Sequence, residues 1–429
     1  MTDGINSRIV IVKILKKIKE SRINIDQCFE KELKKINLSI KDKKYIYNVV
    51  ITTIKNINSI DQILKNFTKS VNKKDVSYFF IISAISQIFI LNQKEYAVIN
   101  STCEAYKRLN KKKLNFINGL LRNITRNKSS INIDKLNKSL HPIWFKNILK
   151  ELPTSKRKVI YKSITKRPLI NLVFKNNKKL NIVKQKFLET SKNSLALSEF
   201  IDLKKISGYN EGLWWVQDFA STIPVKLIPN LKNQNILDMC AAPGGKTFQL
   251  LNSGARVTSC DISINRVKLL KENARRLQYN LNIINMDALK ILENKFFDTV
   301  LIDAPCSSIG TIRKNPEILY RNSGPNFEFY LDLQYKLLEK AKKLLKINGT
   351  LIFAVCSFNK KEGVKQIEKF LLKNKNFQIN PIIKSESKGF KKLVTKEGFF
   401  QSYPDDLNEI GGIDGFFIAR LIKKNDNAL

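Results

Sequence analysis

The second half of this sequence alternates between short apolar runs and longer amphipathic ones. From about Gly208 onward, strand-like stretches are followed in turn by helical ones, which is typical of a parallel sheet with helices packed on both faces. Strands are predicted over residues 235–239, 256–260, 282–285, 299–302 and 349–355, with helices between them, for example over 264–277 and 330–345. We therefore expect a doubly wound α/β fold in this part of the chain.

Polar and reactive residues follow every one of these predicted strands. In an open α/β sheet, ligands bind beyond the carboxyl ends of the strands. The groups at those positions are the turn from Cys240 to Lys246, then Asp261, Asp287, the segment from Asp303 to Cys306, and Cys356. Because the carboxyl ends of parallel strands meet at one edge of the sheet, five such groups in register predict a single site.

A glycine-rich turn follows the first predicted strand. Its sequence is Cys240, Ala241, Ala242, Pro243, Gly244, Gly245, Lys246 and Thr247. A phosphate-binding P-loop would need glycine six positions before the lysine, where this chain has Cys240, so a nucleoside triphosphatase is disfavoured. Paired glycines instead let the backbone approach a ligand closely, and the helix start that follows favours a carboxylate such as that of a methionine moiety. Lys246 could add positive charge there.

Two acids after the next strands suit a nucleoside. Asp261 lies 17 residues beyond Gly244, close to the spacing at which a nucleoside-binding fold places an acid on the ribose hydroxyls. Asp287 follows the third strand and is placed to contact an adenine edge. Either acid alone is more often a helix cap, but their joint placement favours a nucleoside cofactor.

Two cysteines, Cys306 and Cys356, end apolar runs in the segments 303–306 and 354–357. A thiolate in an electropositive site can add to carbon 6 of a cytosine, which makes carbon 5 reactive toward a methyl donor. A second thiol can then remove the proton from carbon 5, while Asp303 can hydrogen-bond the ring nitrogen and the exocyclic amine. These residues predict an RNA cytosine-5 methyltransferase, and the chemistry alone leaves open which thiol attacks.

The charge of the chain favours a nucleic-acid partner. Lys and Arg number 77 against 37 Asp and Glu, which leaves a net charge of +40. Such a field attracts phosphate and speeds encounters with nucleic acid. The sequence is also rich in Lys, Asn and Ile throughout, as biased codon supply would produce. A membrane partner is disfavoured because no basic amphipathic helix stands out.

The rest of the sequence argues against a secreted or membrane-spanning protein and against a metal-binding site. The chain opens without a signal-peptide pattern, and its longest apolar stretch, residues 78–91, is too short to span a bilayer. The chain has a single histidine, His141, and no CxxC pair among its six cysteines: Cys28, Cys103, Cys240, Cys260, Cys306 and Cys356. We expect a cytoplasmic protein with no metal site and no disulfide framework.

The first part of the chain reads as helical. From Arg8 to about Lys128, Pro is absent and Gly nearly absent, and apolar residues recur at intervals of three and four. One stripe is Ile9, Ile11, Val12 and Leu15, and another is Ala97, Ile99, Thr102, Ala105 and Tyr106, with Asn100 as its expected cap. We expect an all-α domain over residues 1–130.

A connector is expected over residues 131–207, ahead of a catalytic domain over 208–429. Pro142, Pro153 and Pro168 interrupt it, and a strand-like run covers residues 169–174, which suits a small α+β unit. His141 has no acid or hydroxyl partner at a telling spacing, so we interpret it as a packing or turn residue.

Several motifs of this chain resemble those of a known enzyme family. Three segments resemble the motifs of the Nop2/Sun (NSUN) type of RNA (cytosine-5) methyltransferase. They are residues 237–247, residues 303–308 with Arg313 to Glu317 after them, and the pair Cys356 and Ser357. Residues 97–100 and 116–122 look like a NusB-like domain, which a bacterial subgroup acting on small-subunit ribosomal RNA carries ahead of its catalytic core. Residues 141–144, 215–218 and 411–416 also look like that subgroup.

This resemblance covers nearly the whole chain and implies roles for its residues. It implies that Cys356 attacks the base, that Cys306 serves elimination, and that the core is a Rossmann-like domain using S-adenosylmethionine. The implied cofactor-binding residues are Cys240, Ala241, Ala242, Pro243, Gly244, Gly245, Lys246, Asp261, Asp287 and Asp303. The connector resembles a small RNA-binding (RRM or ferredoxin-like) fold. The family commonly has Thr before the attacking cysteine, where this chain has Val355.

The resulting hypothesis is methylation of one cytosine in small-subunit (16S) ribosomal RNA by a monomer. The same chemistry on transfer RNA is the nearest alternative, and the helical domain argues against it by resemblance. A non-catalytic, antitermination-like RNA-binding factor is the alternative from another class. Retention of both thiols, Asp303 and the Gly-Gly turn counts against that reading, because a scaffold has no need of them.

Overall fold

The computed structural model describes residues 2–21, 23–34, 36–132, 136, 141–175, 187–191, 193–197, 202–293, 296–321 and 323–425. By packing, the chain forms two compact units. One contains Met1–Lys166 and Ile312–Gly324, and the other contains Arg167–Thr311 and Pro325–Leu429. The three domains expected from the sequence, with boundaries at residues 130 and 207, stay a prediction.

The first unit is helical, as expected. Its helices are α1 (Thr2–Glu20), α2 (Ile25–Leu33), α3 (Ile40–Lys55), α4 (Ile57–Phe67), α5 (Val76–Ile85), the π-helical turn η1 (Ser86–Ile90), α6 (Glu95–Lys107), α7 (Leu114–Arg126), η2 (Lys128–Ser130), α8 (Ile143–Lys150), α9 (Thr154–Ser163) and α13 (Glu317–Tyr320). Several begin at a capping side chain: Asn24 accepts from Gln27 N, Ser39 from Asp42 N, and Asp75 from Ser77 N. These caps fix where the helices start.

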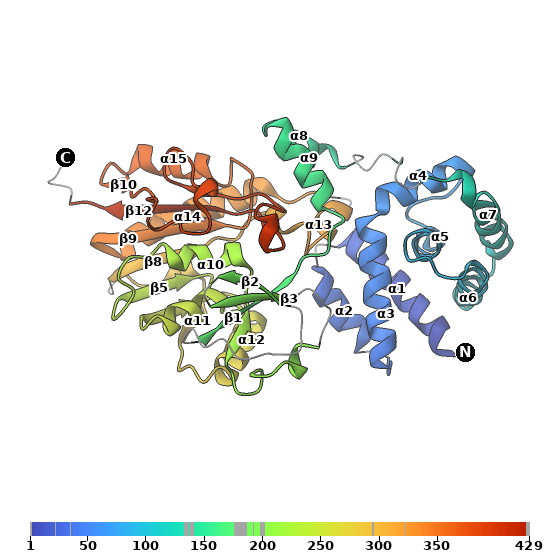
Figure 1. The fold of residues 1–429 in the computed structure, drawn as a ribbon, viewed down its shortest axis with the longest axis horizontal. Coiled ribbons are helices and arrows are strands. Elements are labelled where there is room, and N and C mark those ends of the chain that lie inside the picture. The colour runs from blue at the N-terminus through green and yellow to red at the C-terminus, as the bar shows by residue number, and fades with distance from the viewer. Residues whose placement is uncertain are drawn as a thin grey trace. The chain divides into compact units, whose positions relative to one another are not determined.

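The apolar stretch at residues 78–91 forms the centre of this unit. It corresponds to α5 and η1, and every residue from Ser77 to Ile85 is buried. A helix that is apolar on all sides needs cover on all sides, and α5 packs among α1, α3, α4, α6 and α7 (Figure 1). The buried face of α6 is Val98, Ile99, Thr102, Ala105 and Tyr106.

Two details of α6 differ from the sequence-based expectation. Asn100 is not a cap, because the helix already begins at Glu95 and Asn100 lies inside it. Ala97 is exposed, whereas its neighbour Val98 is buried. Val98 and Ile99 are buried against the bundle, and their packing stabilises a helix that begins at Glu95 rather than at Asn100. His141 stacks on Tyr161, with ring centroids 5.2 Å apart, in agreement with a packing role.

A small antiparallel sheet begins the second unit. Its order is β2-β3-β1-β4, formed by β1 (Ile170–Phe174), β2 (Phe187–Ser191), β3 (Ser194–Leu197) and β4 (Trp214–Val216). The strand expected over residues 169–174 is confirmed as β1. Buried Leu172, Phe174, Leu197, Ile206 and Trp214 form the core beside it. The helix η5 (Leu203–Lys205) connects β3 to β4.

A large mixed sheet forms the rest of the second unit, in the order β10-β12-β9-β8-β5-β6-β7, with β11 paired to β12. Its strands are β5 (Asn235–Met239), β6 (Arg256–Cys260), β7 (Asn282–Ile284), β8 (Phe297–Asp303), β9 (Leu345–Val355), β10 (Phe377–Ile379), β11 (Phe400–Gln401) and β12 (Phe417–Lys423). The five predicted strands are confirmed as β5 to β9, and they pair in parallel. Strands β10 to β12 add an antiparallel edge that the sequence reading did not include.

Helices cover both faces of this sheet (Figure 1). They are α10 (Phe219–Lys226), α11 (Gly245–Asn252), α12 (Ile264–Arg276), α14 (Phe327–Leu344) and α15 (Val364–Lys373), with short helices η6 (Ala288–Lys290), η7 (Ile309–Thr311), η8 (Lys391–Leu393) and η9 (Asn408–Ile410). Alternate strand residues point to opposite faces: Leu301 and Ile352 pack with α10 and α11, whereas Val300 and Leu351 pack with α14 and α15. The doubly wound architecture is therefore confirmed.

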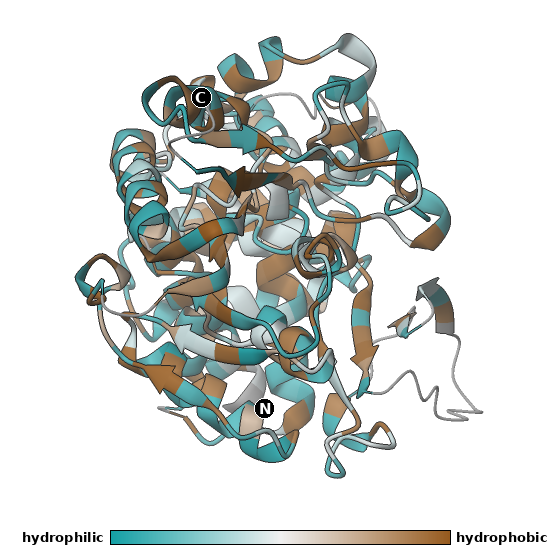
Figure 2. Ribbon diagram, turned by 90° about the vertical axis from the view of Figure 1, so that its left-hand side faces the viewer, coloured by the Kyte–Doolittle hydropathy of each residue, from teal (hydrophilic) through white to brown (hydrophobic). Residues whose placement is uncertain are grey.

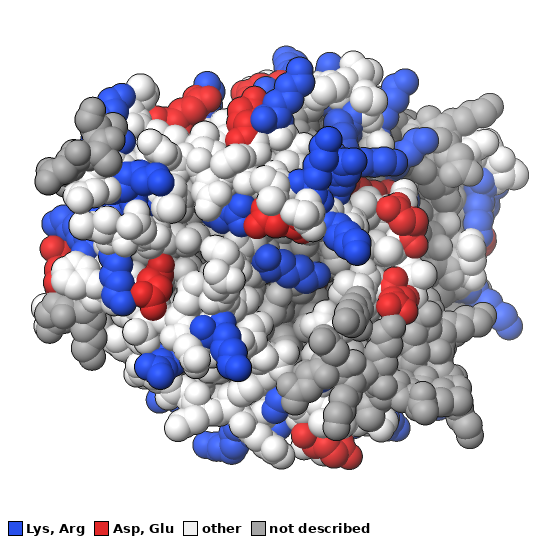
Figure 3. Space-filling model, turned by 60° about the vertical axis from the view of Figure 1, so that its left-hand side comes forward, with Lys and Arg blue, Asp and Glu red and all other residues white. Residues whose placement is uncertain are grey.

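Hydropathy and charge follow this layering. Figure 2 shows the strands of the large sheet mostly hydrophobic and the covering helices banded hydrophobic and hydrophilic. Among the helices of the described residues, none combines the length and the hydropathy needed to cross a bilayer. Figure 3 shows Lys and Arg spread across one face of the molecule, with fewer Asp and Glu among them.

Candidate active site

The carboxyl ends of the parallel strands bring the predicted residues together. In the register of the sheet, Met239 at the end of β5 lies beside Cys260 of β6 and Ile302 of β8. Asp303, the last residue of β8, pairs with Ala354 of β9. The residues that follow these strand ends therefore share one edge of the sheet, as the sequence predicted.

The turn after β5 is a tight, hydrogen-bonded loop. Cys240 has a positive φ of 62°, and the next residue, Ala241, donates its N–H to Cys260 O at 3.0 Å. Gly244 N donates to Ala241 O at 2.9 Å, and α11 begins immediately afterwards. The first turn of α11 thus faces the same edge of the sheet as the strand ends.

Packing supplies a reason for glycine at this turn. Gly244 has a φ of +111°, and a Cβ there would lie 2.3 Å from Leu270 Cδ1 of α12. A Cβ on Gly245 would meet Gln217 Cδ at 3.2 Å. The space beside both glycines is thus filled by the protein's own side chains. Close packing around α11 therefore calls for glycine at Gly244, and close approach of the glycine pair to a ligand stays a prediction.

An acid beneath the turn was not singled out from the sequence. Asp238 is fully buried in β5, and its Oδ2 accepts a hydrogen bond from Thr247 Oγ1 at 2.6 Å. Its Oδ1 has no hydrogen-bond partner among the described residues. Burial raises the pKa of Asp238 to about 7, only partly offset by the Thr247 hydrogen bond. This carboxyl ties strand β5 to helix α11.

The acids after β6 and β7 both hold backbone turns. Asp261, 2 % exposed, accepts from Ala242 N at 3.0 Å and from Ser263 N at 2.9 Å. Asp287 is the cap of η6 and accepts from Leu289 N at 3.0 Å. Their carboxylates are therefore fixed in orientation by local structure, and each oxygen has a further lone pair available to a ligand.

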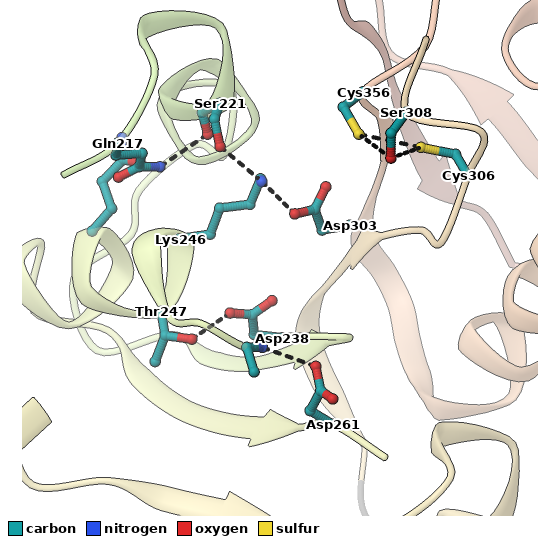
Figure 4. Close-up of polar contacts among 12 residues, drawn as sticks. Gln217, Ser221, Asp238, Lys246, Thr247, Asp261, Asp303, Cys306, Ser308 and Cys356 are labelled. Atoms are coloured by element: carbon teal, nitrogen blue, oxygen red, sulfur yellow. Dashed lines mark hydrogen bonds and ion pairs between the residues drawn. The ribbon is translucent and has the colours of Figure 1, made fainter. Parts of the chain in front are cut away.

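Lys246 and Asp303 form an ion pair at the centre of the site. Lys246 Nζ lies 2.5 Å from Asp303 Oδ2 and 3.1 Å from Ser221 Oγ (Figure 4). The side chain of Lys246 is only 6 % exposed, whereas that of Asp303 is 33 % exposed. The lysine thus comes from α11 and the acid from β8, and the acid presents its outer edge to solvent.

The two thiols lie in direct contact. Cys306 Sγ is 3.3 Å from Cys356 Sγ, and Ser308 Oγ lies 3.4 Å from Cys356 Sγ (Figure 4). Cys306 is buried and Cys356 is partly exposed. The hydrogen bond with Cys356, together with burial, raises the pKa of Cys306 well above its ordinary value. The two thiols named from the sequence therefore lie side by side, and their shared role in one site stays a prediction.

The other cysteines lack such an arrangement. Burial raises the pKa of Cys28, Cys103 and Cys240 above the ordinary thiol value, and that of Cys260 to about 11. Cys306 also has a raised pKa, but among the described residues none of these four thiols has a second thiol beside it as Cys306 does. Their interpretation as small buried residues agrees with this. Among the residues that the structure describes, no cluster of His, Cys, Asp or Glu could hold a metal ion.

Sequence reasoning missed several residues that support the thiols. Gly310 N donates to Cys356 O at 3.1 Å, and Gly415 N donates to Gly310 O at 2.9 Å. A Cβ on Gly310 would lie 1.8 Å from Gly415 O, so only glycine fits between these backbones. Buried Glu362 accepts hydrogen bonds from Ser307 and Ser357. The proximity of Ser308 to Cys306 in sequence was a usable signal, but nothing local marks Glu362.

Comparison with known proteins agrees with this geometry. The family model described as 16S rRNA methyltransferase RsmB/F matches residues 225–422, and the NusB family model matches residues 5–126. Ribosomal RNA small subunit methyltransferase B of Pasteurella multocida is 29% identical over 385 residues, which cover 85% of this chain and 82% of that relative. The same-named protein of Cronobacter sakazakii is 24% identical and covers 99% of this chain and all of its own.

Solved structures share the fold. The crystal structure of PH0851 covers 98% of this chain and 99% of its own, with a TM-score of 0.79 at 22% identity. A methyltransferase homologue from Pyrococcus horikoshii covers 68% of this chain and 98% of its own, with a TM-score of 0.54 at 27% identity. Residues 225–422 thus match the RsmB/F family of S-adenosylmethionine-dependent methyltransferases, and residues 5–126, ahead of this core, match the NusB family.

Proposed function

We propose that this protein methylates carbon 5 of a specific cytosine in small-subunit (16S) ribosomal RNA through a covalent cysteine–cytosine adduct. The observation that carries the proposal is the pair of thiols 3.3 Å apart, Cys306 and Cys356, beside Asp303 at adjacent strand ends. The match of residues 225–422 to the 16S rRNA methyltransferase family RsmB/F supports RNA as the substrate, as does the net charge of +40. A cytoplasmic location and a monomeric state stay predictions.

The residues present suit S-adenosylmethionine. The carboxylates of Asp261 and Asp287 are hydrogen-bond acceptors held at the ends of β6 and β7, where they can accept from ribose hydroxyls and from the adenine amine. The turn from Cys240 to Lys246 and Asp303 border the same edge of the sheet. When bound, the cofactor supplies an electrophilic methyl group.

Cys356 acts as the nucleophile in this proposal. Its thiolate adds to carbon 6 of the cytosine, a sulfur–carbon bond forms, and the electron pair of the C5–C6 double bond moves to carbon 5. The greater exposure of Cys356 than of Cys306 suits a group that must reach the base. Asp303, held by Lys246, accepts a hydrogen bond from the exocyclic amine and so orients the base.

Cys306 acts as the base that completes the reaction. A thiol with a raised pKa is a stronger proton acceptor once it is ionised. Cys306 first loses its thiol proton to solvent, and after the methyl group is in place the resulting thiolate takes the proton from carbon 5. The released pair restores the C5–C6 double bond, the sulfur–carbon 6 bond breaks, and Cys356 leaves as a thiolate.

The experiment that tests the proposal is a denaturing gel of protein incubated with small-subunit ribosomal RNA and S-adenosylmethionine. We expect Cys306→Ala to accumulate a covalent protein–RNA band, because addition proceeds but elimination does not. Cys356→Ala should give no band. Cys260→Ala, which removes a buried thiol of a neighbouring strand, is the control and should behave as wild type.

The other outcomes are equally informative. A band in Cys356→Ala alone would exchange the roles of the two thiols. Methylation of transfer RNA but not of ribosomal RNA would identify transfer RNA as the substrate and would leave the proposed reaction unchanged. No band and no methyl transfer with either RNA would contradict the enzyme and favour an RNA-binding factor.

A further inference from the structure

A buried carboxylate lies behind the two thiols. Glu362 precedes α15 and its side chain is fully buried. Its carboxylate accepts from Ser307 N at 2.7 Å, from Ser357 Oγ at 2.7 Å and from Gln334 Nε2 at 3.4 Å. It also accepts from Ser307 Oγ. Four donors thus converge on one carboxylate.

Two of these partners are the residues that directly follow the thiols. Ser307 comes after Cys306, and Ser357 comes after Cys356. The paired register of β8 and β9 ends at Asp303 and Ala354, so the strand ladder no longer fixes the backbone at the cysteines themselves. The carboxylate of Glu362 therefore joins the two cysteine-bearing loops just beyond the end of the sheet, beside the backbone hydrogen bond from Gly310 N to Cys356 O.

The carboxylate is itself held by neighbouring helices. Gln334 of α14 donates to both Glu362 Oε1 and Pro305 O, the latter at 2.9 Å. Gln366 of α15 donates to Gln334 Oε1 at 3.2 Å and to Leu331 O at 2.7 Å. Glu362 therefore reaches the loops from a network anchored on two packed helices.

Burying a carboxylate costs free energy unless hydrogen bonds compensate for lost hydration. Among the described residues, no Lys or Arg forms an ion pair with Glu362, and its partners are neutral donors, here an N–H, two hydroxyls and an amide. Hydrogen bonds to a carboxylate are stronger and more directional than neutral ones. Such a group is expected where the distance between two loops has to be set closely.

We propose that Glu362 is the positioning residue that holds Cys306 and Cys356 at reacting distance and orientation. The catalytic role of this positioning rests on the proposed function. The distance between the two thiols can be tested without RNA. Its negative charge close to Cys306 also favours the protonated thiol, so that Cys306 is a stronger base when ionised. Glu362 acts through the cysteines and does not itself contact the substrate.

The direct test uses phenylarsine oxide, whose arsenic binds two neighbouring thiols with loss of water. Wild-type protein should bind it tightly, and Cys306→Ala and Cys356→Ala should not. Glu362→Gln preserves the shape of the side chain but removes the charge and one acceptor. We expect its affinity for the arsenical to fall at least about tenfold, since misplacement of one thiol weakens a two-point contact.

The kinetic test separates positioning from folding. We expect Glu362→Gln to lower kcat by on the order of a hundredfold, with KM for RNA and the affinity for S-adenosylmethionine unchanged. Ser357→Ala, which removes one of the four donors, should have a smaller effect in the same direction. The matched control is Glu368→Gln, which removes an exposed carboxylate of α15 that is paired with Lys365, and should match wild type.

Two results would overturn the inference. One is wild-type arsenical affinity and wild-type kcat in Glu362→Gln. The other is loss of S-adenosylmethionine binding together with activity, which would reduce Glu362 to a folding role. If wild type binds the arsenical but methylates no RNA, the proposed function fails, and the arsenical affinity of Glu362→Gln still decides the inference.

Discussion

Individual buried carboxyls around the site are stabilised in different ways. Glu362 collects four hydrogen-bond donors, whereas Asp238 has Thr247 Oγ1 on one oxygen and no partner among the described residues on the other. A carboxyl with so little compensation favours its neutral form. This explains why burial raises the pKa of Asp238 to about 7.

Asp238 should therefore make stability depend on pH. In the unfolded chain an aspartate titrates near 3.9, so between about pH 4 and 7 the folded chain holds a proton that the unfolded chain has released. The contribution of this carboxyl is fully present below pH 4 and is lost as pH rises to about 7. Asp238→Asn cannot titrate. Between pH 5 and pH 8 we expect it to gain about 2–3 kcal/mol relative to wild type.

The measurement is urea unfolding of both proteins at pH 5, 6.5 and 8. Asp332→Asn, which removes an exposed carboxylate of α14 paired with Lys336, is the matched control and should parallel wild type. Parallel pH profiles for Asp238→Asn and wild type would rule out a raised pKa at Asp238.

At the scale of elements, the junction between β5 and α11 depends on one glycine. Gly244 combines a left-handed backbone conformation with close contacts, since a Cβ would lie 2.3 Å from Leu270 and 2.6 Å from Phe248. Leu270 belongs to α12 and Phe248 to α11. The glycine therefore lets both helices pack closely behind the turn that borders the site.

Gly244→Ala should be strongly destabilising. The left-handed conformation costs an alanine about 1–2 kcal/mol, and overpacking against Leu270 and Phe248 adds about 1–3 kcal/mol. Gly389→Ala is the matched control, because Gly389 also has a positive φ, of +88°, but has open space around its Cβ position. Thermal unfolding should show a clearly larger loss of Tm for Gly244→Ala. Equal losses would mean that backbone strain alone explains the glycine.

At the scale of the whole molecule, residues 312–324 join the N-terminal helical unit although they follow the cysteine motif in sequence. Within that unit, Glu317 Oε1 accepts from Ile25 N at 3.2 Å, and Arg321 donates to Ile23 O at 3.0 Å. Tyr320 is 5 % exposed and belongs to the unit's apolar core. The helical unit thus includes a segment inserted from the methyltransferase half of the chain.

Tyr320→Ala should destabilise the helical unit by about 3–5 kcal/mol, as expected for loss of a buried aromatic side chain. Hydrogen exchange would show this as lost protection in α1 and α4. Tyr320→Phe is the control: the buried hydroxyl has no hydrogen-bond partner among the described residues, so its removal should be neutral or stabilising. Unchanged protection in Tyr320→Ala would contradict the place of this segment in the core.

Much of the site was accessible from the sequence because its residues share a simple local rule. Cys240, Asp261, Asp303 and Cys356 each stand at the end of an apolar run, and the parallel sheet brings those ends together. Periodicity likewise predicted the helical bundle and strands β5 to β9. Strands β10 to β12 are short or lie in an antiparallel edge, where no alternating βα pattern marks them.

The sequence by itself determined the fold class, the edge of the sheet where the candidate site lies, and the pair of thiols, because these follow from spacing between neighbours. Only the tertiary structure decided that Lys246 pairs with Asp303, that Gly244 serves packing, and that residues 312–324 belong to the helical unit. Glu362 shows the reason. Its partner Ser307 is 55 residues away, and a contact between such distant side chains exists only once strands and helices have packed.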